Sequence, residues 1–271
     1  MTTPIRASML PSYPDCPRRA AAKALAREIA DAGHSLRETA PSVGAAMGTA
    51  VHAAAAEALR RKRDGETAET DQGVERALEE FRAETEPGAV WDDSSPDRRT
   101  AEAQIQRQVR AYVTTVVPLV DPVLIETPLE ADAGDGFKLT GHLDLFTADG
   151  AVRDLKTGAV DRPYSAQLGA YALLLRSHGH TPKTLVTDWI KRTRLKAAQP
   201  APVPSVHDRA LSERAAAENV QHIKQSITAW REAGRDDPSA FLANPMSLMC
   251  SEKFCPAHGT TWCAFGRKAN G

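Results

Sequence analysis

Two short stretches of the chain, TGHLDLF at residues 140–146 and VRDLKTG at residues 152–158, decide the fold. A TADG turn lies between them, so the sequence predicts two strands of a β-hairpin. Alternate residues of a strand share one face, so Asp154 and Lys156 point the same way. Pairing across the hairpin can bring Asp144 beside them. Two carboxylates and one ammonium group then meet in one small volume.

Such a group of side chains has the chemistry that hydrolysis of a phosphodiester requires. Carboxylates hold one or two hard divalent cations, which polarise the phosphoryl oxygen and lower the pKa of bound water. Lys156 would orient the attacking water or stabilise the developing negative charge. The alternative is an amphipathic hairpin with a charged solvent face, because Asp-x-Lys alone is common.

The rest of the chain predicts an α/β fold with a small mixed sheet flanked by helices. Helices are expected at residues 17–32, 42–63, 71–84, 96–117, 164–177 and 208–233, and strands at residues 123–129, 137–146, 151–157 and 184–193. A proline-rich segment, residues 200–204, separates this core from the last helix. We expect a single domain over residues 1–271, with a core at 46–200 and a long helix at 205–234.

Composition and charge exclude several classes of protein. The 271 residues include 42% hydrophobic residues, enough to bury a core, so disorder, collagen and coiled coil are excluded as the main architecture. With 34 Lys and Arg against 35 Asp and Glu, the net charge of -1 argues against a uniformly basic nucleic-acid coat. No membrane span or secretory signal is apparent, so we expect a soluble cytoplasmic protein with no membrane partner.

Two further motifs accompany the hairpin. Gly48 and His52 form Gly-x-x-x-His on an alanine-rich helix, where a single histidine is either a metal ligand or a core residue. Gln167 and Tyr171 form Gln-x-x-x-Tyr on the helix after the hairpin and share one face of it. With Gly-x-x-Asp ending at Asp144 and the Asp-x-Lys strand, these motifs resemble the RecB-like nucleases of the PD-(D/E)XK superfamily over roughly residues 48–175.

The resemblance implies a restriction-endonuclease-like core and a DNA exonuclease that depends on Mg2+ or Mn2+. It implies metal ligation by His52, Asp144, Asp154 and the Leu155 carbonyl, catalysis by Lys156 with Asp144 and Asp154, and positioning of DNA or the lysine by Gln167 and Tyr171. DNA with a free end or a single strand would be the substrate, in recombination, repair, CRISPR-type or phage-encoded DNA processing. The sequence lacks G-x-x-x-x-G-K-[ST], so unwinding would require a helicase or recombination partner. A non-catalytic DNA-binding or scaffold protein of this fold is the alternative.

Four cysteines form a divided pattern, with Cys16 near the N-terminus and Cys250, Cys255 and Cys263 in the C-terminal tail as C-x4-C-x7-C. Four thiolates could hold zinc or an iron–sulfur cluster, and His258 would permit a local zinc site without Cys16. The pattern resembles the iron–sulfur staple of AddB-type helicase–nucleases and CRISPR-associated spacer-acquisition nucleases, although its C-terminal spacing is longer than in many members. This resemblance implies a [4Fe-4S] cluster that joins residues 1–45 to residues 235–271.

Basic residues at the start of the first helix and at the end of the fourth strand are candidates for DNA contacts. Together they would line a groove that follows the phosphates; they are Arg18, Arg19, Lys191, Arg192 and Arg194. The alternative for such runs is an ordinary solvated surface. Trp189 could stack on an unpaired base or pack in the core.

Overall fold

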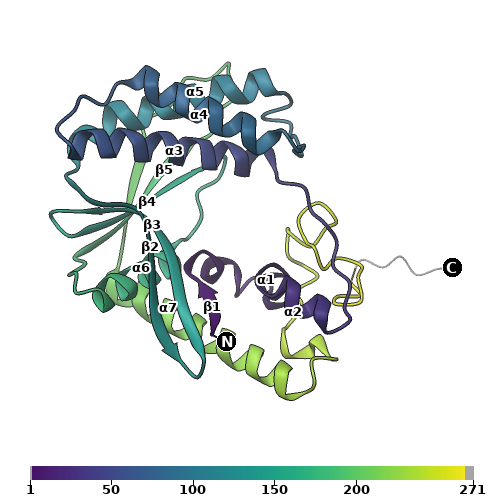
Figure 1. Ribbon diagram of the computed structural model, residues 1–271. Coiled ribbons are helices and arrows are strands. Elements are labelled where there is room, and N and C mark those ends of the chain that lie inside the picture. Colours follow the sequence, from purple (N-terminus) through teal and green to yellow (C-terminus); the bar gives the residue numbers. More distant parts are fainter. Residues whose placement is uncertain (1, 266–271) are drawn as a thin grey trace.

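A six-stranded mixed sheet forms the centre of the computed structural model, which describes residues 2–265 (Figure 1). Its strands follow the order β1-β3-β4-β5-β6, and β2 also pairs with β3. The bounds are β1 Thr3–Arg6, β2 Pro122–Gly134, β3 Phe137–Thr147, β4 Ala151–Gly158, β5 Thr184–Lys191 and β6 Val203–His207. The β1–β3 and β4–β5 pairs are parallel and the others antiparallel, so the predicted mixed sheet is confirmed.

Helices cover both faces of this sheet (Figure 1). The α-helices are α1 Pro17–Ala24, α2 Ala26–Asp31, α3 Val43–Arg63, α4 Thr70–Thr85, α5 Arg98–Thr115, α6 Ser165–Ser177 and α7 Arg209–Glu232, and the short 3-10 helices are Ala7–Ser12, Val117–Leu119 and Pro238–Ala240. Leu155 and Ile190 share a hydrophobic core with α3, α4 and α5. Val152 and Leu185 share the opposite core with α6 and α7. Within residues 2–265, no helix combines the length and apolar character needed to cross a bilayer.

Small residues let α3 and α6 approach their neighbours closely. Ser42 caps the start of α3, where its hydroxyl accepts a hydrogen bond from the Ala45 backbone N–H at 3.2 Å. Four basic residues lie in the last turn of α3, where their positive charge interacts favourably with the helix dipole. A Cβ at Gly48 would lie 3.2 Å from the Thr157 hydroxyl of β4. At Gly169 of α6, the backbone of Ser212 in α7 leaves no room for a Cβ. These contacts hold the motif-bearing helices against the sheet and against each other.

The structure corrects one expected helix and adds two strands that the sequence did not indicate. The predicted single helix over residues 17–32 is wrong, because the backbone leaves helical geometry at Leu25 and divides it into α1 and α2. The N-terminal strand β1 carries too few residues to be recognised as a pattern. The proline-rich segment contributes the edge strand β6, where Pro204 is tolerated because the edge leaves one row of backbone groups unpaired.

The C-terminal tail folds back over the first helix (Figure 1). Arg18 donates to the carbonyls of Phe241 and Pro238, both at 3.0 Å, and the Trp262 indole N–H donates to the Arg18 carbonyl at 3.2 Å. Trp230, at the end of α7, makes an edge contact with Trp262 at 5.2 Å between ring centroids. The two chain ends therefore meet, which brings Cys16 next to the tail.

Candidate active site

Three side chains that could ligate a metal converge where α3 crosses β2 and β3. The His52 Nδ1 atom lies 3.5 Å from Asp144 Oδ2 and 3.8 Å from Glu126 Oε1. One ligand atom from each residue lies within 4.8 Å of the other two. A histidine nitrogen and two carboxylates suit a divalent cation such as Mn2+ or Mg2+. His52 and Asp144 were predicted from the sequence, whereas Glu126 was not.

Glu126 reaches this group because its backbone is left-handed, with φ of 43°. It lies on β2 between the pairs Ile125↔Leu145 and Thr127↔Leu143, opposite Asp144. Such a conformation is uncommon for a residue with a Cβ, and inside a strand it marks Glu126 as a residue held by its surroundings. Its Oε2 atom also lies 2.9 Å from His142 Nδ1. The only sequence signal was an acidic residue inside an apolar run, which does not reveal a left-handed backbone.

The Asp144 side chain also accepts a backbone hydrogen bond from β4 beyond the point where the pairing of β3 with β4 ends. The β3–β4 pairing covers only Phe146↔Val152 and Leu145↔Arg153, and the two strands then diverge. The next backbone N–H, that of Leu155, donates to Asp144 Oδ2 at 2.8 Å. This contact places Asp144 between α3 and β4, beside Asp154, as the hairpin interpretation expected.

Asp154 and Lys156 form a buried ion pair, with 2.8 Å between Nζ and Oδ2. Asp154 is fully buried, and apart from the ion pair neither of its oxygens accepts a hydrogen bond from the described residues. The ammonium group also lies 4.8 Å from the centre of the Tyr164 ring, a contact that the sequence did not predict. Asp154 does not belong to the group of His52, Glu126 and Asp144. Of the metal ligands expected from the sequence, this group therefore contains His52 and Asp144.

The charges of these groups depend strongly on one another. Burial acts to lower the pKa of His52, but the charge of Asp144 and hydrogen bonds to Asp144 and Glu126 outweigh it and raise this pKa to about 10. Burial raises the pKa of Asp154 to about 6, although Lys156 acts in the opposite direction. Burial also opposes the charge on Lys156, but Asp154 and Asp144 raise its pKa above the usual range. The lysine therefore carries its charge, and a cation would replace the proton on His52.

Gln167 and Tyr171 lie together on α6, as predicted, and the Gln167 side-chain N–H donates to the Tyr171 hydroxyl at 2.8 Å. Both side chains are buried. The Tyr171 ring lies against Gly141 of β3 so closely that a Cβ there would be 2.8 Å from Tyr171 Cε1. The glycine of the Gly-x-x-Asp motif therefore provides room for this ring.

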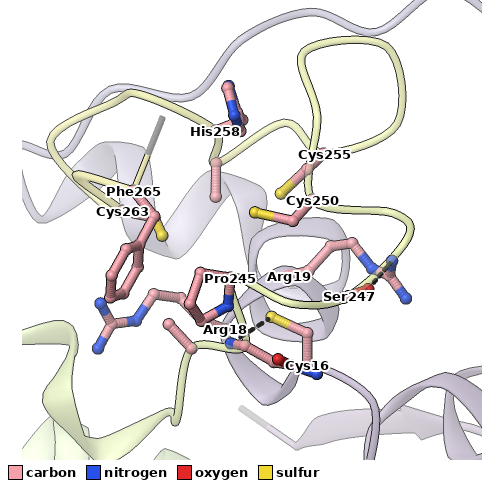
Figure 2. A pocket seen from close by; sticks show the side chains of 13 residues that line it. Cys16, Arg18, Arg19, Pro245, Ser247, Cys250, Cys255, His258, Cys263 and Phe265 are labelled. Atoms are coloured by element: carbon pink, nitrogen blue, oxygen red, sulfur yellow. Dashed lines mark hydrogen bonds between the residues drawn. The ribbon is translucent and has the colours of Figure 1, made fainter. Parts of the chain in front are cut away.

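Four free thiols line a second pocket, between the N-terminal helix and the tail (Figure 2). They belong to Cys16, at the N-terminus of α1, and to Cys250, Cys255 and Cys263. Burial raises the pKa of Cys250 and of Cys255, and negative charge on the other thiols raises both further. Within residues 2–265, no three ligand atoms of these cysteines or of His258 lie within 4.8 Å of one another. The four sulfurs thus share one pocket at a wider spacing than the three-residue metal group.

The five basic residues expected to contact DNA have different surroundings. Arg18 donates to tail carbonyls, and Arg19 donates to Asp15 at 3.0 Å. Arg192 donates to Asp92 at 2.8 Å. Lys191 and Arg194 are exposed. Three of the five guanidinium and ammonium groups are therefore engaged in contacts within the chain.

The sequence pattern of the PD-(D/E)XK nuclease superfamily matches residues 5–264. Among solved structures, a protein from Eubacterium rectale that is described as a candidate exonuclease is 12% identical, with a TM-score of 0.55 over 82% of this chain and 80% of that one. LHK-Exo, solved in complex with dAMP, is 11% identical, with a TM-score of 0.31 over 69% of this chain and 97% of that one. No curated protein sequence matches the chain.

Proposed function

Because the chain belongs to the PD-(D/E)XK nuclease superfamily, we propose that it is a divalent-metal-dependent exonuclease that hydrolyses phosphodiester bonds in DNA. The observation that carries the proposal is the convergence of His52, Glu126 and Asp144 beside the buried Asp154–Lys156 pair. The Eubacterium rectale protein, described as a candidate exonuclease, shares the fold and supports an exonuclease over other nucleases.

The donor set fits a hard divalent cation. His52, Glu126 and Asp144 would hold Mg2+ or Mn2+. The buried Asp154 oxygens offer a further ligand, because apart from the ion pair with Lys156 they accept no hydrogen bond from residues 2–265. When bound, the ion polarises the phosphoryl oxygen and lowers the pKa of the attacking water. Leu155 would add its carbonyl, as the RecB-like resemblance implies.

The protein's own groups would act on the phosphate as follows. Lys156 keeps its proton, because Asp154 and Asp144 raise its pKa, and it would stabilise the negative charge that develops on the phosphate. Asp154 holds the ammonium group in place at 2.8 Å. Gln167 and Tyr171, which are buried and hydrogen-bonded to each other, would position DNA or the lysine, as the RecB-like resemblance implies.

Cleavage of labelled linear DNA, single-stranded and double-stranded, with Mg2+ or Mn2+ tests this function. We expect mononucleotides or short products from free ends and none from covalently closed circles. Asp154→Asn should lose cleavage, while Asp135→Asn, an exposed substitution outside the site, should retain it. Full cleavage by Asp154→Asn, or no cleavage by the wild type with either metal, would overturn the proposal.

We also propose that the four thiols bind a [4Fe-4S] cluster that joins residues 1–45 to the tail from residue 235, in the manner of the AddB-type and CRISPR-associated nucleases. The proposal is supported by the placement of all four thiols around one pocket, although Cys16 lies more than 230 residues before the other three. Residues 266–271 of the expected staple lie outside the described part of the chain.

Spectroscopy of anaerobically purified protein tests the cluster. We expect a brown sample with broad absorbance near about 400 nm and about four irons for each chain. Cys16→Ala should lose the cluster and lower the melting temperature. A colourless sample with stoichiometric zinc, or an unchanged spectrum in Cys16→Ala, would contradict the assignment.

A further inference from the structure

Two adjoining hollows lie between the segment that follows Lys156 and the loop that joins Cys250 to Cys255. The first is lined by residues next to the catalytic lysine, among them Thr157 and Tyr164. The second extends to the staple, where Lys253 and Phe254 line it. The two hollows adjoin because they share lining residues, among them Arg162 and Arg192, and we call the pair the staple groove.

The staple groove is positively charged. Lys23 of α1, Arg162 and Lys253 are exposed cations along it. Arg192 also lines it, but its charge is balanced by Asp92, 2.8 Å away, which lines the groove as well. Three cations without a balancing acidic group in the lining suit an anionic polymer that follows the groove, and phosphate neutralisation of this kind supplies most non-specific affinity for nucleic acid.

The groove is also lined by an aromatic ring. Phe254 is half-buried, and the Lys253 ammonium group lies 5.3 Å from the centre of its ring. An aromatic ring beside a cation is the arrangement on which unpaired bases stack while the adjacent phosphate is neutralised. Duplex DNA presents its phosphates outward and keeps its bases stacked inside, so it cannot use this ring.

Lys253 and Phe254 belong to the four residues between Cys250 and Cys255, the longer C-x4-C spacing noted in the sequence. Contacts with other parts of the chain fix the position of this loop. Cys255 is buried in the thiol pocket, and Arg37 pairs with Glu252 at 3.2 Å while its backbone N–H donates to the Pro256 carbonyl at 2.8 Å. These contacts fix the cation and the ring where the groove leaves the nuclease core.

We infer that the staple groove binds single-stranded DNA beyond the scissile phosphate, with Phe254 stacking on a base and with Lys23, Arg162 and Lys253 neutralising phosphates. The inference rests on the proposed nuclease function for the identity of the polymer. The loop within the longer C-x4-C spacing would thus contact the substrate, while Cys250 and Cys255 at its two ends would ligate the proposed cluster.

Equilibrium binding of a labelled 12-nucleotide single strand tests the groove without requiring hydrolysis. The measurement uses the full chain carrying Asp154→Asn, so that the strand stays intact, and compares Lys253→Ala, Phe254→Leu and the surface control Lys183→Ala in that background. Lys253→Ala should reduce the slope of log affinity against log salt by about 0.7, the value for one phosphate on a single strand. Phe254→Leu should weaken binding about ten-fold with an unchanged slope.

Three controls separate the outcomes. Iron content and melting temperature should match the parent, because Lys253 is exposed and Phe254 is only half-buried. Blunt duplex DNA should lose less than about two-fold in affinity on Phe254→Leu, since paired bases cannot reach the ring. Parent-like binding by both variants, or equal losses for duplex and single strand, would overturn the groove, whereas a wild type that binds but never cleaves would overturn only the nuclease function.

Discussion

Replacing Gly141 with alanine should destabilise the protein by overpacking the contact between β3 and α6. The new Cβ would lie 2.8 Å from Tyr171 Cε1 and 3.0 Å from Leu174 Cδ1. Carbon atoms in contact prefer about 3.5–4.0 Å, so the ring must move by about 0.7 Å or the strand must shift. The ring is 3% exposed and its hydroxyl accepts a hydrogen bond from Gln167, so neither movement is free.

Overpacking of this kind costs about 1–3 kcal/mol, which for a chain of this length lowers the melting temperature by roughly 3–10 °C. Gly73 of α4 offers a matched control, because a Cβ there would make an ordinary contact of 3.5 Å with Val109. Gly73→Ala should raise stability by about 0.5–1 kcal/mol, since alanine favours a helix. Thermal and denaturant unfolding of both variants measures the contrast.

A double-mutant cycle identifies the cause. In a Tyr171→Ala background the clashing ring is absent, so Gly141→Ala should cost less than it does alone by about 1 kcal/mol or more. Cleavage should also fall in Gly141→Ala, because Tyr171 and Gln167 move together. A Gly141→Ala protein as stable as the wild type, or a cycle without coupling, would refute the packing argument.

Three further predictions concern charge. Burial raises the pKa of Asp154 from 3.8 to about 6, so the folded chain binds the proton of this carboxyl group more tightly than the unfolded chain does. The protonated carboxyl group therefore stabilises the fold below about pH 4, and this contribution is lost as the pH rises through 6. Asp154→Asn should therefore raise the melting temperature of metal-free protein at pH 8 but not at pH 4, and an equal effect at both would contradict the burial argument. Glu126→Gln should raise the Mg2+ concentration for half-maximal cleavage by roughly ten-fold or more, as loss of a ligating or supporting carboxylate does, and an unchanged requirement would remove Glu126 from the metal site. Arg18→Ala should lower the melting temperature with little change in the salt dependence of DNA binding. Arg194→Ala, at an exposed position, should reduce the salt dependence and leave the melting temperature unchanged. A reduced salt dependence with an unchanged melting temperature in Arg18→Ala would show that Arg18 contacts a phosphate.

Local patterns in the sequence were sufficient for most of the fold. Helices α3, α5 and α7 begin where Ser42, Asp97 and Asp208 cap them, and each cap accepts a hydrogen bond from the third residue after it. The β3–β4 hairpin follows from two alternating strands around a short turn. These features depend on neighbours a few residues apart, so they are visible without any tertiary information. Strands β1 and β6 were not, because short edge strands exist only by pairing with distant partners.

In the candidate site too, the sequence predicted the contacts between residues close together in the chain and not those that depend on distant residues. The spacing of Asp154 and Lys156 on one strand, and of Gln167 and Tyr171 on one helix, predicted the neighbours that the structure places together. Glu126 lay beyond such an argument, because its left-handed backbone reflects the meeting of β2, β3 and α3 and not its own neighbours in the chain.

For this protein, the sequence alone indicated most of the residues that carry the proposed chemistry, with the exception of Glu126, and the tertiary structure decided where their charges act. Arg18 and Arg192 resemble phosphate contacts in the sequence, yet the folded chain turns them toward the Phe241 carbonyl and Asp92. Lys253, which has no distinguishing signal, lines the staple groove together with Arg162. The reason is that side-chain identity is a local property, whereas burial and the pairing of charges depend on residues that only folding brings together.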